Sequence, residues 1–63
     1  MNVYERMIRA LEIFGGYDHV KSVGADAGEI FAGPHPDRVS VEHLDELKAL
    51  GWHPDGDYFQ HYL

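Results

Sequence analysis

The segment from Ser40 to Trp52 constrains the fold more than any other part of the chain, because its residues specify both ends of a helix. Ser40 is a favoured N-cap residue, since its hydroxyl can accept a hydrogen bond from a backbone N–H of the first turn. Gly51 favours a left-handed helix stop, and the Trp52 that follows it can fold back onto Leu47, as in a Schellman motif. The segment therefore predicts a helix from Ser40 to Leu50 whose end is held against a core by Trp52.

Another helix is predicted near the N-terminus, from Asn2 to Phe14. Asn2 and Glu5 have the spacing of a capping box, and the pair Gly15-Gly16 follows the last apolar residue as a stop. Apolar residues recur every three or four positions along this segment, which indicates an amphipathic face. With Ile8 beside them, the residues expected on that buried face are Val3, Met7, Ala10, Leu11 and Phe14.

The residues between the two helices predict a β-hairpin. Val20–Val23 and Glu29–Ala32 are short runs with β-forming residues, and the turn-rich run Gly24–Gly28 separates them. Gly33 and Pro34 end the second strand. The prolines in the loop that follows exclude a central strand or a helix there.

The C-terminal residues predict one more strand, Asp57–Leu63, after a turn at residues 53–56 in which Pro54 takes the second position. Along this strand Tyr58, Gln60 and Tyr62 face one way, and Trp52-His53 can pair with it as a short hairpin. The order α-β-β-α-β predicts a single α+β domain over residues 1–63. Its two helices pack on one face of a three-stranded antiparallel sheet.

The net charge of the chain limits the kinds of molecule that it could bind. Eleven Asp and Glu face five Lys and Arg, which gives a net charge of −6. Such a surface repels nucleic acid and anionic membranes and attracts basic protein surfaces, although acidity can also serve solubility alone. The chain has no cysteine and no apolar run long enough to span a membrane. Because the first residues also lack the features of a secretory signal, we expect a cytoplasmic protein.

The sequence offers little chemistry for catalysis. It has only two serines, Ser22 and Ser40, no threonine and no glycine-rich phosphate loop. His43 can reach Ser40, but the cap already explains that serine. The histidines match no metal-binding spacing, so we expect no enzyme, no cofactor and no metal site, and a metal-dependent regulator is a lesser alternative. The five histidines are His19, His35, His43, His53 and His61.

The aromatic residues are more numerous than one small core can bury, so some are expected on the surface, where Tyr and Trp often mark protein interfaces. The alternative is that they only cover the second side of a thin sheet. Carboxylates near them could meet Lys and Arg of a partner. The residues expected to bind a partner are Glu29, Asp37, Glu42, Asp45, Glu46, Asp55, Asp57, Tyr58 and Tyr62.

The C-terminal part of the chain resembles short proteins of phages and mobile elements, in which a strand of the form (D/E)-I-(Y/F)-A-G leads to an acidic helix ending in L-x-x-L-G-W. Residues 29–33 (EIFAG) and 47–52 (LKALGW) carry this likeness. In size, charge and lack of cysteine the whole chain is also similar to the small acidic anti-CRISPR proteins. Members of that group block the RNA-guided surveillance complex of the host, several by occupying its basic DNA channels.

This resemblance implies a phage-derived inhibitor that acts in the bacterial cytoplasm. Its acidic surface would mimic DNA, bind a basic subunit of a CRISPR surveillance complex and block DNA binding, without itself binding nucleic acid or membrane. The alternative is a small non-enzymatic interaction module, or a homodimer, of a mobile element whose acidity serves only solubility. Salt distinguishes the two, because binding by a charge mimic weakens as salt is added.

Overall fold

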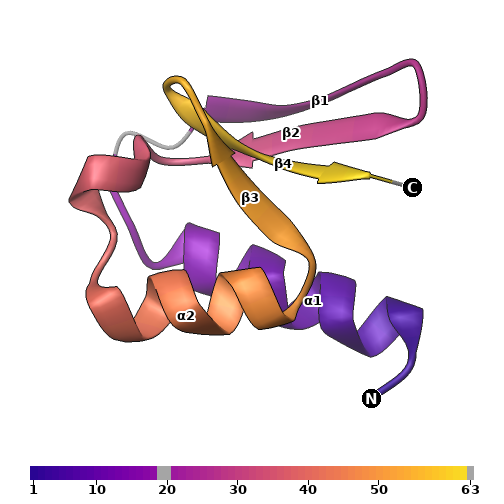
Figure 1. Ribbon diagram of the computed structural model, residues 1–63, viewed down its shortest axis with the longest axis horizontal. Helices are drawn as coiled ribbons and strands as arrows, with labels where there is room; N and C mark the ends of the chain where they lie inside the picture. Colours follow the sequence, from indigo (N-terminus) through magenta and orange to yellow (C-terminus); the bar gives the residue numbers. More distant parts are fainter. Residues whose placement is uncertain (19–20, 63) are drawn as a thin grey trace.

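The computed structural model describes residues 1–18 and 21–62, and it has two layers, with two helices on one side of an antiparallel sheet (Figure 1). The helices are α1 (Val3–Gly15) and α2 (Val41–Ala49), and the short 3-10 helix η1 (Pro36–Arg38) precedes α2. The sheet has the order β1-β2-β4-β3. Its strands are β1 (Lys21–Asp26), β2 (Glu29–Gly33), β3 (Trp52–Asp55) and β4 (Tyr58–Tyr62). The predicted α+β class is confirmed.

Both helices begin and end where local sequence signals predict. Asn2 and Glu5 form a reciprocal capping box, with N···O distances of 2.9 and 3.1 Å. The Ser40 hydroxyl accepts a hydrogen bond from the backbone N–H of His43 at 3.2 Å and caps α2. Gly51 has a φ of +96°, and its N–H donates to the carbonyl of Lys48, so α2 ends in the predicted left-handed stop.

The core lies between the two layers and centres on Trp52, whose side chain is fully buried. The ring of Phe14 meets Trp52 edge-on, with centroids 5.1 Å apart, and lies beside Phe59 at 5.4 Å. Leu47 is also fully buried, as expected for a helix end held by Trp52. The buried apolar residues are Ala10, Ile13, Phe14, Ala32, Val39, Leu47, Leu50, Trp52 and Phe59.

The predicted buried face of α1 is partly wrong. Ala10 and Phe14 are buried and Met7 packs against the core, but Leu11 is 41% exposed and Val3 is 58% exposed. Ile13 takes part in the core instead. Apolar residues occur on two sides of this helix, so their spacing alone does not identify the side that meets the sheet.

The sheet has four strands rather than the predicted three, because the pairing expected of Trp52 and His53 continues to Asp55. The predicted turn around Pro54 is therefore wrong: Pro54 lies within β3 and pairs with Phe59, and the turn is Gly56-Asp57. A proline is tolerated there because β3 is an edge strand, so one side of its backbone needs no ladder donor.

The first hairpin is also longer than predicted. β1 continues through Gly24 to Asp26, so the turn shrinks from five residues to Ala27-Gly28. The register of the β1–β2 pair shifts between Lys21 and Gly24, which marks a bulge. His19, Val20 and Leu63, which figured in the sequence-based predictions, lie outside the described residues.

Candidate functional site

Both helices lie on the same side of the sheet, and no helix of the described residues covers the opposite face (Figure 1). Ala32, Trp52 and Phe59 point toward the helices and are buried, so residues adjacent to them along each strand belong to the opposite face. The register places Phe31 opposite Gln60 on that face. We call this surface the open sheet face. Its members among the described side chains are Asp26, Glu29, Phe31, His53, Asp55, Tyr58 and Gln60.

An aromatic pair lies on the open sheet face. The rings of Phe31 and Tyr58 come from neighbouring strands and meet edge-on, with centroids 5.1 Å apart and an interplanar angle of 78°. Both residues are half-buried although no helix covers them, and Gln60 beside them is only 8% exposed. The pair thus forms an apolar surface that includes one phenol ring, a combination suited to a protein contact.

Carboxylates border the aromatic pair at both ends of the sheet. At the β3–β4 turn, Asp55 lies opposite Tyr58, and Asp57 follows in the turn. At the other end, Asp26 and Glu29 face each other directly across the β1–β2 hairpin. Like charges at opposed positions repel each other, so a cationic partner would relieve a repulsion that the folded protein otherwise retains.

His35 links the Asp55 end of the sheet to η1. Its Nδ1 accepts a hydrogen bond from the backbone N–H of Asp37 at 3.1 Å, and its Nε2 lies 3.5 Å from Oδ1 of Asp57. His35 thus lies beside both Asp37 and Asp57, and its Nδ1 is 3.8 Å from Oδ2 of Asp37.

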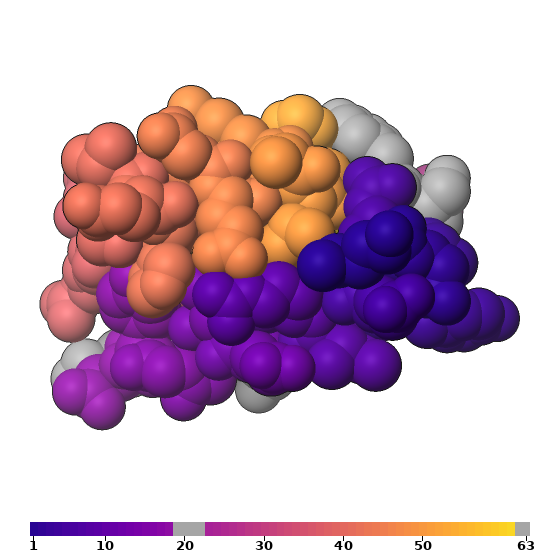
Figure 2. Space-filling view, turned by 90° about the horizontal axis from the view of Figure 1, so that it is seen from below, coloured from indigo at the N-terminus to yellow at the C-terminus, as the bar shows by residue number. Residues whose placement is uncertain are grey.

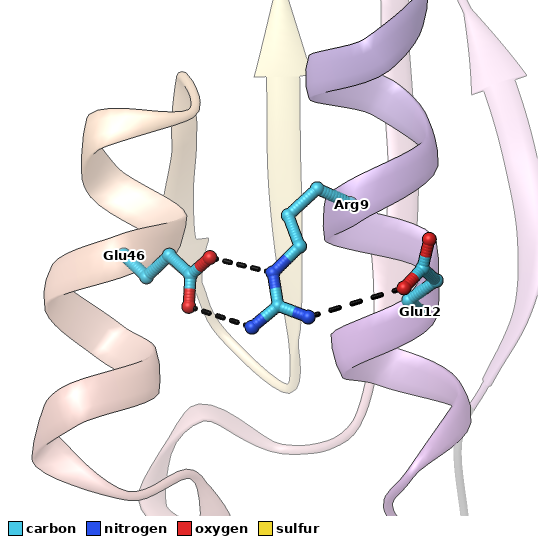
Figure 3. Close-up of polar contacts among 3 residues, drawn as sticks. All are labelled: Arg9, Glu12 and Glu46. Atoms are coloured by element: carbon cyan, nitrogen blue, oxygen red, sulfur yellow. Dashed lines mark hydrogen bonds and ion pairs between the residues drawn. The ribbon is translucent and has the colours of Figure 1, made fainter.

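The acids of α2 lie in the helical layer, away from the open sheet face. Glu42 and Asp45 are exposed. Glu46 instead forms a two-point ion pair with Arg9 of α1, in which Nε and Nη2 donate at 2.6 and 3.0 Å (Figure 3). Glu12 lies on the other side of the same guanidinium, at 3.9 Å. Glu46 thus joins the two helices and would have to leave Arg9 to meet a partner.

The Arg9–Glu46 pair also affects titration. The hydrogen bonds from Arg9, and secondarily its charge, hold the pKa of Glu46 below its usual value. The same hydrogen bonds raise the pKa of Arg9. Both side chains remain more than a third exposed, so solvent screens much of this attraction.

The serine and histidine considered for catalysis have other partners. The hydroxyl of Ser40 accepts the capping hydrogen bond, and the ring of His43 meets the hydroxyl of Tyr17, with Nδ1 and O 2.6 Å apart. The backbone N–H of Ser40 donates to the same hydroxyl at 3.2 Å. Tyr17 thus ties the chain after α1 to the start of α2. This network accounts for these polar groups as structural contacts.

The structure separates the nine predicted partner-binding residues into two layers. Asp55, Asp57 and Tyr58 come together with Asp37 at one end of the sheet. Glu29 lies at the other end opposite the backbone of Tyr62, whose side chain lies outside the described part. The remaining three residues, Glu42, Asp45 and Glu46, belong to α2.

Sequence reasoning missed Phe31 on the open sheet face and the contact that His35 makes beside it. Phe31 alternates with the buried Ala32, which is a signal for the open face, but a three-stranded sheet gave no reason to pair it with Tyr58. His35 carried no signal, because its contact with Asp57 joins residues that are far apart in the sequence.

Three comparisons were made with known proteins. A scan against models of protein families, a search of curated proteins and a search of solved structures found no match to this chain. Within residues 1–18 and 21–62, no three His, Asp or Glu side chains are grouped so that they could hold a metal ion. In the same residues, no helix is long and apolar enough to cross a membrane.

Proposed function

We propose that this protein is a non-enzymatic inhibitor of the anti-CRISPR type. It would bind a basic subunit of a bacterial CRISPR surveillance complex in the host cytoplasm and occupy the surface that receives DNA. The observation that carries the proposal is the open sheet face, where the Phe31–Tyr58 pair is bordered by carboxylates at both ends. This observation supports a protein-binding surface, and the resemblance described above suggests the kind of partner.

The electrostatics support a basic partner. Among the described side chains, every ion pair with Arg or Lys involves Arg9, and no described arginine or lysine pairs with Glu29, Asp55 or Asp57. These carboxylates can take the place of DNA phosphates toward Lys and Arg of the partner. Such pairing mainly raises association rate and specificity, whereas the desolvated aromatic pair would supply much of the binding free energy.

The structure also defines which acids to test. The first variant would combine Asp55→Lys and Asp57→Lys, and its matched control, with the same change in net charge, would combine Glu42→Lys and Asp45→Lys on α2. Purified surveillance complexes of several CRISPR types would be tested for binding of labelled target DNA in the presence of each protein. We expect the natural protein to inhibit one type, and the first variant to need at least about tenfold more protein for the same inhibition.

The control variant should inhibit as the natural protein does, and both variants should keep the circular dichroism spectrum of the natural protein. Equal loss in both variants would show that total charge, not the open sheet face, determines inhibition. Absence of inhibition for every complex type would refute the anti-CRISPR function and favour the small interaction module.

A further inference from the structure

The exposed apolar residues of the protein are concentrated on α1. Among the described residues, seven large apolar side chains are exposed, and five of them lie in the first eleven residues. Tyr4, Ile8 and Leu11 are spaced four and three residues apart, so they form one stripe along the helix. Their side chains are 77%, 56% and 41% exposed. We call these three residues the α1 stripe.

The α1 stripe lies on the side of α1 away from α2. Arg9 reaches across to α2, and at about 100° per residue Tyr4, Ile8 and Leu11 lie about 140°, 100° and 160° around the helix from it. α1 contacts β2 and α2 contacts β3, so the side away from α2 lies below the edge strand β1. β1 carries another exposed apolar residue, Val23.

The helical layer of the described residues holds two α-helices, α1 and α2. Figure 2 shows α1 (indigo to purple) and α2 (salmon to orange) side by side across the lower face of the molecule. The residues that the structure describes form no third α-helix, although the sheet above has four strands. A helix beside α1 and below β1 would cover the α1 stripe and complete the layer.

Charge decides which helix could bind there. Glu5 and Glu12 lie three residues before and four residues after Ile8, so both border the α1 stripe on one side. Glu12 also lies 3.9 Å from the guanidinium of Arg9, and both side chains in that contact are more than a third exposed. A second copy is a poor occupant: parallel helices would bring Glu5 against Glu5, and antiparallel helices would bring Glu5 near Glu12. A helix with apolar residues along one face and Lys or Arg beside them would satisfy both the stripe and its acidic border.

We infer that the α1 stripe binds an amphipathic helix of a partner protein, with lysine or arginine along the border of its apolar face. This surface lies in the helical layer and not on the open sheet face. It therefore extends beyond the proposed function, and either surface can fail its test without the other.

The test uses two synthetic peptides as probes, each about as long as α1. One has a leucine face bordered by lysines, and the other has glutamates in place of the lysines. Each is titrated into the ¹⁵N-labelled protein while backbone amide shifts are recorded by NMR. We expect the lysine peptide to shift the backbone amide resonances of the α1 stripe and of Glu12, and these shifts should saturate as peptide is added. The Kd of the lysine peptide should be at least about tenfold lower than that of the glutamate peptide.

Matched variants locate the site. Ile8→Ser should raise the Kd of the lysine peptide at least about tenfold, whereas Val41→Ser, at an apolar residue of α2 that is 70% exposed, should leave it unchanged. Thermal melting checks that both variants fold. If Ile8→Ser does not fold, Glu12→Lys replaces it, because reversing a charge at the border of the stripe should also raise the Kd of the lysine peptide.

Three results would overturn the inference. The lysine peptide could leave the α1 stripe unshifted up to millimolar concentration, or both peptides could bind equally. The third such result is that the amide resonances of the α1 stripe shift when only the protein concentration is changed, which would mean that a second copy covers the stripe.

Discussion

Gly33 shows how one residue fixes the contact between the helical layer and the sheet. Its φ is +95°, a conformation that L-residues rarely adopt, and a Cβ added to it would lie 2.8 Å from two ring carbons of Phe14. Both constraints act at the end of β2, so only glycine permits the strand to end against that ring.

We predict that Gly33→Ala lowers the free energy of unfolding by at least about 2 kcal/mol, because backbone strain and the clash with Phe14 add. Urea denaturation measures this loss. Gly28→Ala is the matched control, since Gly28 has a φ of +80° but nothing within 4 Å of the added Cβ, and strain alone should cost about 1 kcal/mol. Equal losses for the two variants would show that the ring contact has no effect.

The Arg9–Glu46 pair makes a pH-dependent contribution to stability. The pKa of Glu46 is lower in the folded protein than the value of about 4.3 expected in the unfolded chain. The unfolded chain therefore binds the proton first as pH falls, so the pair stabilises the fold above about pH 4.3, and this contribution is lost on further acidification.

We predict that Glu46→Gln is less stable than the natural protein near pH 7, and that the two melting temperatures converge toward about pH 3. Thermal melts over this range measure the convergence. Glu42→Gln, on the same helix and without an ion pair among the described side chains, should keep the natural pH dependence. If the melting temperatures of Glu46→Gln and the natural protein differed by the same amount at all pH values, the pH dependence would not come from the Arg9–Glu46 pair.

Sequence reasoning predicted contacts between residues that are close along the chain. The Asn2–Glu5 box and the Ser40 cap each join residues three positions apart, and their chemistry is visible in the sequence. The pair Arg9–Glu46 joins residues 37 positions apart, and Tyr17–His43 joins residues 26 apart. Such contacts depend on how the helices pack, which no local pattern specifies.

At the scale of elements, the β1–β2 hairpin has an unusual turn. Both turn residues have positive φ, +50° at Ala27 and +80° at Gly28, as in a type I′ turn. Glycine suits this conformation, but alanine is strained in it, and asparagine adopts it more readily. The strain explains why the sequence did not identify this two-residue turn.

We predict that Ala27→Asn stabilises the protein by about 1 kcal/mol, which for a domain of this size raises Tm by about 4–8 °C. Circular dichroism melting measures the shift. Ala25→Asn, in the adjacent strand, is the control and should not raise Tm, because asparagine is unfavourable in strands. An unchanged or lowered Tm for Ala27→Asn would mean that the turn is not strained.

The two errors at this scale have different causes. Proline is a good turn residue, so the sequence placed a turn at Pro54, but an edge strand also accepts proline. The buried face of α1 was misjudged because apolar residues extend around the helix to Tyr4, Ile8 and Leu11. The position of β3 at the edge of the sheet decides the first case, and the number of helices that cover the sheet decides the second. Both are properties of the tertiary structure.

At the scale of the whole molecule, the predicted arrangement of two helices on one face of the sheet holds, and it leaves the opposite face open. The alternation in β4 correctly assigned Tyr58 and Phe59 to opposite faces. The grouping of the acids could not be predicted, because it depends on the fourth strand and on the loop that brings His35 to Asp57. The open sheet face is therefore the surface on which the account of function depends.

The most direct test of that account is capture of a partner at two salt concentrations. The tagged protein and the variant carrying Asp55→Lys and Asp57→Lys would each be incubated with lysate of a bacterium that expresses a CRISPR surveillance complex. Capture would be compared at about 0.1 M and about 1 M salt, where the Debye length falls from about 10 Å to about 3 Å. We predict that the natural protein retains a basic subunit of the complex at low salt only, and that the variant retains none. Retention that is equal at both salt concentrations, or capture of nothing but the protein itself, would contradict the account.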